Sequence, residues 1–117
     1  MSFSELIQSS TLTDTQVESL VLYANVLSGK MKLKDAASKR SKGPVSVGAF
    51  WRVVQQGRTN VKKSIVTMIL ASWLGIVKTD ELRRLMELTA LRGQTIDVAA
   101  AEQAQSLVLG LVERIVM

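Results

Sequence analysis

The chain contains no cysteine and no histidine among its 117 residues. Without cysteine it forms neither disulfides nor thiolate metal sites, which fits a protein of the reducing cytoplasm, where we expect this one. Histidine is the commonest general base, cysteine the strongest nucleophile, and both are the usual zinc ligands. Their joint absence argues against an enzyme. We therefore expect no catalytic residue, no metal and no cofactor.

Proline, strand signals and long apolar runs are also scarce. Pro44 is the only proline, and alternating β-branched runs joined by Asn-Gly or Asp-Gly turns are missing. We expect an all-α fold of five to seven helices in a single domain over residues 1–117, because this length can bury one core. The longest apolar stretch, Ile65–Val77, is 13 residues, short of the roughly 20 that span a bilayer. It is expected to be a buried helix, and no secretory signal or membrane association is expected.

Positive charge, in contrast, is concentrated in one segment. Residues 30–63 carry ten lysines and arginines against one acid, Asp35, and so have a net charge of +9, whereas the whole chain has +5. The remaining residues are therefore mildly acidic. A compact basic segment between acidic flanks is typical of a protein that binds a polyanion on one face. The alternative is a solvated lysine-rich loop.

Apolar spacing and end signals predict seven helices. They cover residues 1–10, 13–29, 31–40, 46–56, 59–75, 79–93 and 97–117. Ser46 is suited to an N-cap, and Gly29, Gly57 and Gly75 to helix ends. The helix over 59–75 is expected to be the central core helix. Four of these helices are expected to turn apolar residues inward. These residues are Val17, Leu20, Val21, Ala24 and Leu27 in the helix over 13–29; Leu33, Ala36 and Ala37 in that over 31–40; Val47, Phe50, Trp51 and Val54 in that over 46–56; and Leu82, Leu85 and Met86 in that over 79–93.

Residues 31–58 contain a small residue inside a helix, a turn glycine, a Val-Ser pair before a second helix, and then two apolar residues and one basic residue. These are Ala37, Gly43, Val45-Ser46, Phe50, Val53 and Arg52. The pattern resembles the helix-turn-helix DNA-binding domain of small prokaryotic, archaeal-type transcriptional regulators. The turn departs from that family, because five residues instead of three separate Ala37 from Gly43 and Pro44 is extra. Helical-face counting buries Trp51 while the family register exposes it, so we expect partial burial.

The resemblance implies that the helix over 46–57 docks in the major groove of double-stranded DNA. Its free face is expected to contact base edges through Gly48, Arg52, Gln55 and Gln56. Arginine pairs best with guanine and glutamine with adenine, while glycine permits close approach. Phosphates are expected to be contacted by Lys39, Arg40, Lys42, Ser46, Arg58, Lys62 and Lys63. The alternative for each of these polar side chains is a solvated surface position.

The last expected helix, over about 96–117, is apolar over much of its circumference. Steps of three and four, typical of a helix–helix seam, connect Val98, Ala101, Gln105, Val108, Val112 and Ile115. A stripe this wide packs either deeply in its own core or against a second copy. We expect this helix to join a DNA-binding homodimer; the sequence identifies no small-molecule effector.

Other functions remain open from sequence. A helical RNA-binding or ribonucleoprotein subunit would use the same basic face, although only five aromatic residues are available for base stacking. A protein–protein adaptor would dock its apolar terminal helix on a partner and use the basic patch for solubility. An enzyme comes last, because its candidate acids, Asp80, Glu81 and Asp97, stand at predicted helix starts, where capping explains them.

Overall fold

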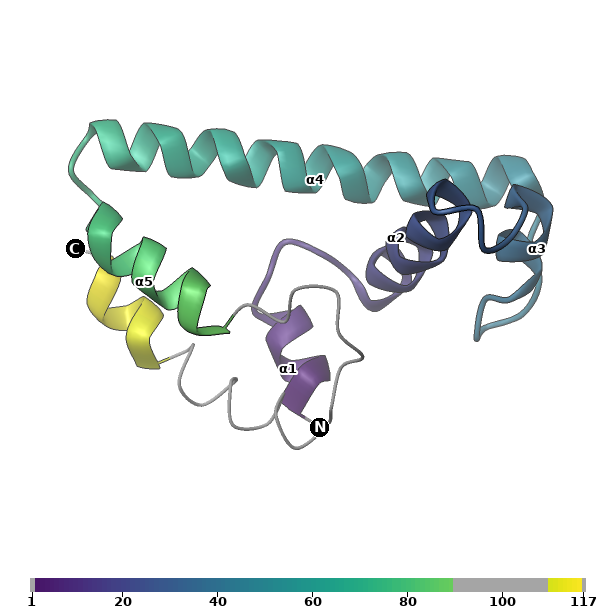
Figure 1. The fold of residues 1–117 in the computed structure, drawn as a ribbon, viewed down its shortest axis with the longest axis horizontal. Helices are drawn as coiled ribbons and strands as arrows, with labels where there is room; N and C mark the ends of the chain where they lie inside the picture. The colour runs from purple at the N-terminus through teal and green to yellow at the C-terminus, as the bar shows by residue number, and fades with distance from the viewer. Residues whose placement is uncertain (1, 90–109, 117) are drawn as a thin grey trace. The chain divides into compact units, whose positions relative to one another are not determined.

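The computed structural model describes residues 2–89 and 110–116. Its helices are α1 (Ser2–Gln8), α2 (Asp14–Leu27), α3 (Leu33–Ser38), α4 (Val47–Trp73) and α5 (Thr79–Thr89), followed by a helical segment over 110–115 (Figure 1). Within the described ranges the fold is all-α, as predicted, and the only β-pairing is an isolated antiparallel bridge between Val77 and Val116. None of the described helices is long and apolar enough to cross a membrane.

The chain divides into two compact units. The basic unit comprises Ile7–Ser64, and the C-terminal unit comprises residues 65–117 together with 1–6. The basic unit holds ten lysines and arginines against three acids, Asp14, Glu18 and Asp35, whereas the C-terminal unit holds five against seven. The uneven distribution of charge along the sequence therefore coincides with a structural division.

Helix α2 begins and ends where its sequence predicts. Thr13 Oγ1 accepts a hydrogen bond from Gln16 N at 3.1 Å, and Gln16 Oε1 accepts one from Thr13 N at 3.1 Å. This reciprocal pair satisfies two backbone donors that the first helical turn would otherwise leave unpaired. Beyond the other end, Gly29 has a φ of +79°, a conformation in which a side chain would be strained.

The buried face of α2 differs from the predicted one. Val21 and Leu27 are 55% and 71% exposed, whereas Ser19 is completely buried and Tyr23 and Val26 pack on the core. The prediction was wrong because the polar Ser19 lies on the buried face and interrupts its apolar pattern. Hydrophobic spacing therefore pointed to a neighbouring face.

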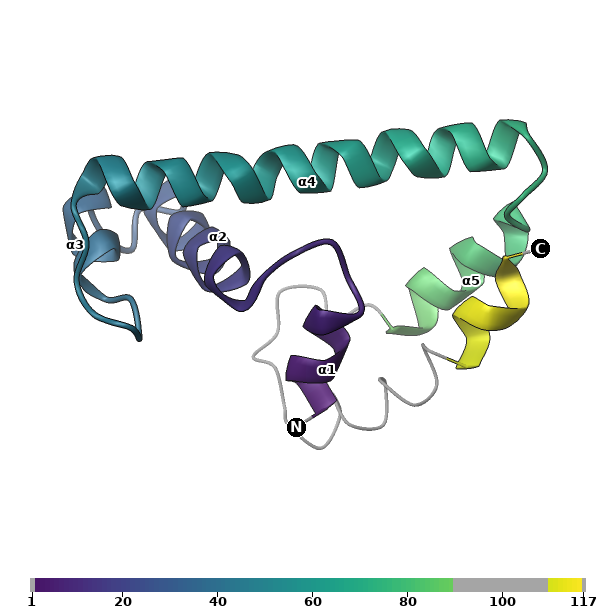
Figure 2. The ribbon, with the colours of Figure 1, turned by 180° about the vertical axis from the view of Figure 1, so that it is seen from behind.

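The core of the basic unit is formed by α3 and the first turns of α4. Its fully buried residues are Ala36, Ala37, Phe50 and Val54. α2 and α3 both lie beside the N-terminal half of α4 (Figure 2), and alanine permits this close packing because it has only a methyl group. α3 is shorter than the predicted helix over 31–40, since it spans only Leu33–Ser38.

α4 is one uninterrupted helix, although two helices separated near Gly57 were predicted. Gly57 is buried inside α4 and does not adopt a left-handed conformation. A Cβ atom at this position would lie 2.9 Å from Cδ1 of Leu20, so the glycine allows α2 to approach closely. The prediction was wrong because a glycine marks a helix end and a close packing site equally well in sequence.

In the C-terminal unit, a small core joins α5, the helical segment over 110–115 and the connection between α4 and α5. Val77, Leu85 and Ile115 are buried there. The backbone contributes as well, because Lys78 N donates to Ile115 O at 3.1 Å. This hydrogen bond holds the C-terminal segment next to the start of α5.

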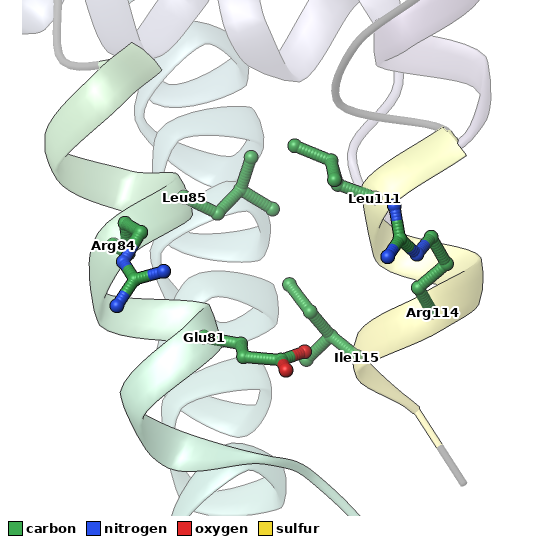
Figure 3. Close-up of a pocket in the computed structure, with 6 residues that line it drawn as sticks. All are labelled: Glu81, Arg84, Leu85, Leu111, Arg114 and Ile115. Atoms are coloured by element: carbon green, nitrogen blue, oxygen red, sulfur yellow. The ribbon is translucent and has the colours of Figure 1, made fainter.

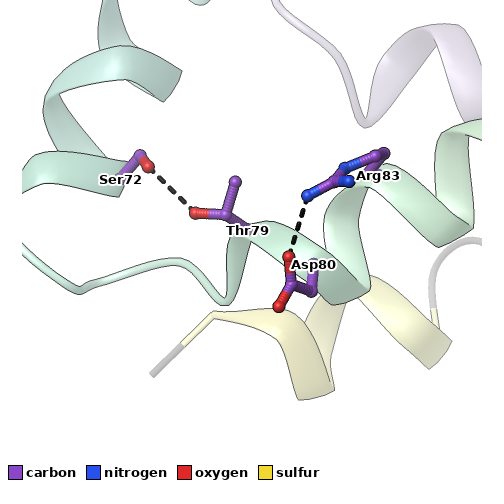
Figure 4. A network of polar contacts seen from close by, with 4 residues as sticks. All are labelled: Ser72, Thr79, Asp80 and Arg83. Carbon is purple, nitrogen blue, oxygen red and sulfur yellow. Dashed lines mark hydrogen bonds and ion pairs between the residues drawn. The ribbon is translucent and has the colours of Figure 1, made fainter.

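The end of α4 and the start of α5 follow the predicted signals. Gly75 has a φ of +72°, and Ile76 N donates to Ala71 O at 2.9 Å, which closes α4. α5 then begins at Thr79. The hydroxyls of Ser72 and Thr79 are hydrogen-bonded at 2.9 Å, and on α5 Arg83 Nη2 lies 2.8 Å from Asp80 Oδ1 (Figure 4).

Two burial predictions for the C-terminal unit are wrong. The stretch over 65–74 is not a core helix, because most of its large apolar side chains are exposed: Ile65, Val66, Ile69, Leu70, Trp73 and Leu74. On α5, Leu85 is buried as predicted, whereas Met86 is 64% exposed. Within the described ranges, the core of this unit packs against only one face of the second half of α4, through Met68 and Ala71.

Candidate nucleic-acid interface

The N-terminus of α4 is organised by Ser46, the predicted N-cap. Ser46 Oγ accepts a hydrogen bond from Ala49 N at 3.1 Å, and Ser46 O accepts one from Phe50 N at 3.0 Å. Before it, Gly43 adopts a φ of +115°, which only glycine takes up readily. In an α-helix the first N–H groups have no carbonyl partner within the helix, and the helix dipole favours negative charge at this end.

The turn between α3 and α4 is held at both sides. Val45 N donates to Ala37 O at 3.2 Å, and Ser41 N donates to Oε1 of Glu18 on α2 at 3.0 Å. The predicted helix-turn-helix unit thus contains eight residues between its helices, 39–46. These backbone hydrogen bonds keep the long turn ordered although it exceeds the compact form.

The first turns of α4 have one anchored face and one free face. Phe50 and Val54 are completely buried. At 100° per residue, the four residues expected to contact bases lie within about 100° of one another on the other side. They are Gly48, Arg52 and Gln56, which are exposed, and Gln55, which is half-buried. Helical periodicity therefore placed three of the four correctly on an accessible surface.

The residues expected to contact phosphate are less uniform. Lys39, Lys42, Ser46, Lys62 and Lys63 are exposed, whereas Arg40 and Arg58 are half-buried. The Nε atom of Arg40 is buried without a hydrogen-bond partner. Arg58 lies about 120° around α4 from Arg52 and lines a hollow on α2 with Leu20, Tyr23, Ala24 and Leu27. Arg58 therefore does not share the free face of Arg52.

Lys63 continues the exposed side of α4 that begins at Gly48. Arg52, Gln56, Thr59 and Lys63 follow one another in steps of four, three and four residues, so they form a single ridge along α4. All four are exposed. The ridge combines two cations with two uncharged hydrogen-bonding side chains over three turns of helix.

Trp51 borders this face. Its ring contacts that of Tyr23 on α2 edge-to-face, with centroids 5.2 Å apart and an interplanar angle of 68°. The indole is 37% exposed, which agrees with the predicted partial burial. This contact favours one orientation of the Trp51 side chain next to Arg52, because edge-to-face pairs favour one relative ring orientation.

Sequence reasoning missed an apolar groove beside the free face. It has a volume of about 520 Å³ and is lined by Tyr23, Val26, Leu27, Leu33, Val47, Gly48 and Trp51. The exposed Leu27 forms part of its wall. The signal for this groove lies in α2, where apolar residues occur on more faces than one core requires.

A smaller hollow occurs in the C-terminal unit. Its volume is about 210 Å³, and its lining combines charged and apolar side chains: Glu81, Arg84, Leu85, Leu111, Arg114 and Ile115 (Figure 3). Neither arginine makes an ion pair within the described ranges. The described residues also contain no group of three or more acids that could hold a metal ion.

Of the six residues expected at the dimer interface, four lie outside the described residues: Val98, Ala101, Gln105 and Val108. Val112 is 41% exposed, whereas Ile115 is only 5% exposed and belongs to the core of its own chain. Most of the predicted helix over 96–117 is likewise outside the described ranges.

No protein-family model matches the chain, and neither a curated protein nor a solved structure is detectably similar to it.

Proposed function

We propose that this protein is a DNA-binding transcriptional regulator of the helix-turn-helix type, which inserts the first turns of α4 into the major groove of duplex DNA as a homodimer. The observation that carries the proposal is the exposed ridge of Arg52, Gln56 and Lys63 on a helix anchored from behind by Phe50 and Val54. An anchored helix holds its outward side chains in fixed positions, which base readout requires.

The residues divide into two roles by position. Arg52 would pair with guanine and Gln56 with adenine, since each offers the matching pattern of donors and acceptors in the major groove. Gly48, whose added Cβ would meet no atom within 4 Å, leaves room for the DNA backbone. Gln55 is half-buried and would contribute less.

Phosphate binding would come from the two ends of this helix segment. Lys39 and Lys42 lie in the turn before α4, where the Ser46 cap and the first N–H groups add hydrogen-bond donors. Lys62 and Lys63 lie four turns further along. Arg40 and Arg58, being half-buried, would act mainly through long-range attraction.

A binding assay across a salt series tests the proposal. Four lysine–phosphate contacts per copy, from Lys39, Lys42, Lys62 and Lys63, predict that log affinity falls against log salt concentration with a slope of about −4 per bound copy. Fluorescence anisotropy with duplex and single-stranded probes of equal length would measure this slope. Absence of salt-dependent duplex binding would refute the proposal, whereas equal affinity for single strands would favour the RNA-binding alternative.

One observation favours a second candidate, a protein–protein adaptor. The groove between Tyr23, Leu33 and Trp51 is almost entirely apolar and lies open at the surface. Such a groove suits the apolar face of a partner helix. If Leu27→Glu abolished the biological activity while leaving duplex affinity unchanged, the adaptor function would be preferred.

A further inference from the structure

In the described structure, the second half of α4 has one packed face and one face with exposed apolar side chains. Met68 and Ala71 are half-buried and contact the core formed by Val77, Leu85 and Ile115. On the opposite side, four large apolar side chains are exposed: Val66 by 63%, Ile69 by 45%, Leu70 by 53% and Trp73 by 81%. We call these four residues the α4 seam.

The α4 seam has the geometry of a helix–helix contact. At 100° per residue its four members lie within an arc of about 100°. Their spacing of three, one and three residues is that of a coiled-coil stripe, in which side chains of one helix fit between those of another. Seen down the helix, the centre of the stripe lies about 180° from the face that carries Met68 and Ala71.

The uncovered area is large for a monomer. Ile65 and Leu74 flank the seam and are 56% and 63% exposed. Together the six side chains present several hundred Å² of apolar surface, on the order of the ~800 Å² that each partner buries in a standard interface. The largest apolar patch of a typical monomer is about 300–600 Å² and is often functional.

A second copy of this chain is the occupant that fits. No charged residue occurs between Ser64 and Val77, so two copies of the seam bring no like charges together. A two-fold interface must be self-complementary, and an uncharged apolar stripe meets this requirement.

We propose that the α4 seam is a homodimer interface, in which α4 of one copy packs along α4 of the other. This interface differs from the predicted one in the helix over 96–117. The use of this dimer in DNA binding rests on the function proposed above. The dimer itself can be measured without DNA.

Sedimentation equilibrium of the full chain at micromolar concentration provides the first test. The expected mass is twice 12.8 kDa for the natural sequence and 12.8 kDa for Leu70→Glu, because a buried carboxylate in the seam would be unpaired. The matched control is Met86→Glu on α5, whose side chain is 64% exposed outside the seam, and which should remain a dimer. Unchanged circular dichroism would show that both variants fold.

A cross-linking experiment locates the contact independently of stability. Since the chain has no cysteine, Ile69→Cys introduces a single thiol midway along the length of the seam. Residues at the centre of a two-fold interface lie next to their own symmetry mates, so mild oxidation should give a disulfide-linked dimer. Met86→Cys, as the control, should give none. Equal cross-linking of both variants would overturn the proposed location.

The remaining outcomes also decide the matter. A monomeric natural chain would overturn the proposal. In that case, a lower Tm of Leu70→Glu would indicate that residues 90–109 cover the seam. An unchanged Tm would indicate a different protein as the partner. A dimer that persists in Leu70→Glu would overturn the location. A chain that dimerises but binds no duplex DNA would refute the proposed function alone, and a monomer that binds DNA would refute this inference alone.

Discussion

Gly57 of α4 lies so close to Leu20 of α2 that a Cβ atom on the glycine would be 2.9 Å from Cδ1 and 3.1 Å from Cγ of the leucine. Only glycine lets the two helices pack at this distance without moving the leucine. This contact lies in the basic unit, one turn beyond Val54, and contributes to holding α4 in place behind its exposed ridge.

Replacement of Gly57 by alanine should therefore destabilise the fold. Overpacking costs about 1–3 kcal/mol, which exceeds the gain of up to ~1 kcal/mol from better helix propensity. Gly48 is the matched control, because it lies in the same helix with no atom within 4 Å of an added Cβ. Urea denaturation should show a lower midpoint for Gly57→Ala and an equal or higher one for Gly48→Ala. The reverse order would mean that α2 and α4 are not in close contact.

Ser19→Ala should stabilise the protein. Ser19 is completely buried, and its hydroxyl has no hydrogen-bond partner within the described structure. An unpaired buried hydroxyl costs about 1–3 kcal/mol, and alanine removes it without leaving a large cavity. The expected gain is about 1 kcal/mol, measured by urea denaturation. A loss of stability would show that the hydroxyl has a partner such as a bound water.

Ser46→Ala should weaken the start of α4. The Ser46 Oγ atom accepts the hydrogen bond of Ala49 N, and losing such a cap costs about 0.5–2 kcal/mol. Ser46→Asp preserves the cap and should keep the thermal midpoint close to the natural value. It should nevertheless weaken duplex binding, since it places a negative charge where a phosphate is expected. Undiminished DNA affinity of Ser46→Asp would remove Ser46 from the phosphate contacts.

Arg52→Ala and Lys62→Ala should impair DNA binding in different ways. Loss of a base contact at Arg52 should relax sequence preference by about 1–3 kcal/mol. Loss of a phosphate contact at Lys62 should weaken binding to all sequences alike and make the salt slope less steep by about 1. Selection from a random duplex library followed by salt titration measures both effects.

Arg84→Ala and Lys78→Ala serve as the charge-matched controls. Both side chains are exposed in the C-terminal unit, so their loss should leave sequence preference and salt slope nearly unchanged. If Lys62→Ala altered the sequence preference and Arg52→Ala did not, the readout would lie on a different face of α4.

Several helix ends were predictable from sequence, although the end predicted at Gly57 does not occur. The helix start at Thr13–Asp14, the N-cap at Ser46 and the helix-ending glycines at positions 29 and 75 occur where the sequence predicts them. Each depends on hydrogen bonds between residues only a few positions apart, so neighbouring residues suffice to specify it.

Burial was less predictable. Ser19 lies in the core while Leu27 and Trp73 are exposed, because burial depends on which elements pack against a helix. The candidate site shows the same contrast: exposure of Arg52 and Gln56 follows from the period of α4, whereas the half-burial of Arg58 depends on the position of α2.

The sequence by itself determined the all-α fold, the capped helix starts, the uneven charge distribution and the face that places Arg52 opposite Phe50, since all of these follow from composition or from interactions within one helix. Only the tertiary structure decided that α4 continues through Gly57, that α2 turns Ser19 inward, and that Val66 and Trp73 remain uncovered. A glycine, a serine or an apolar residue has the same local preferences whether it is buried or exposed. Its role depends on which residues, distant in sequence, lie within a few ångströms.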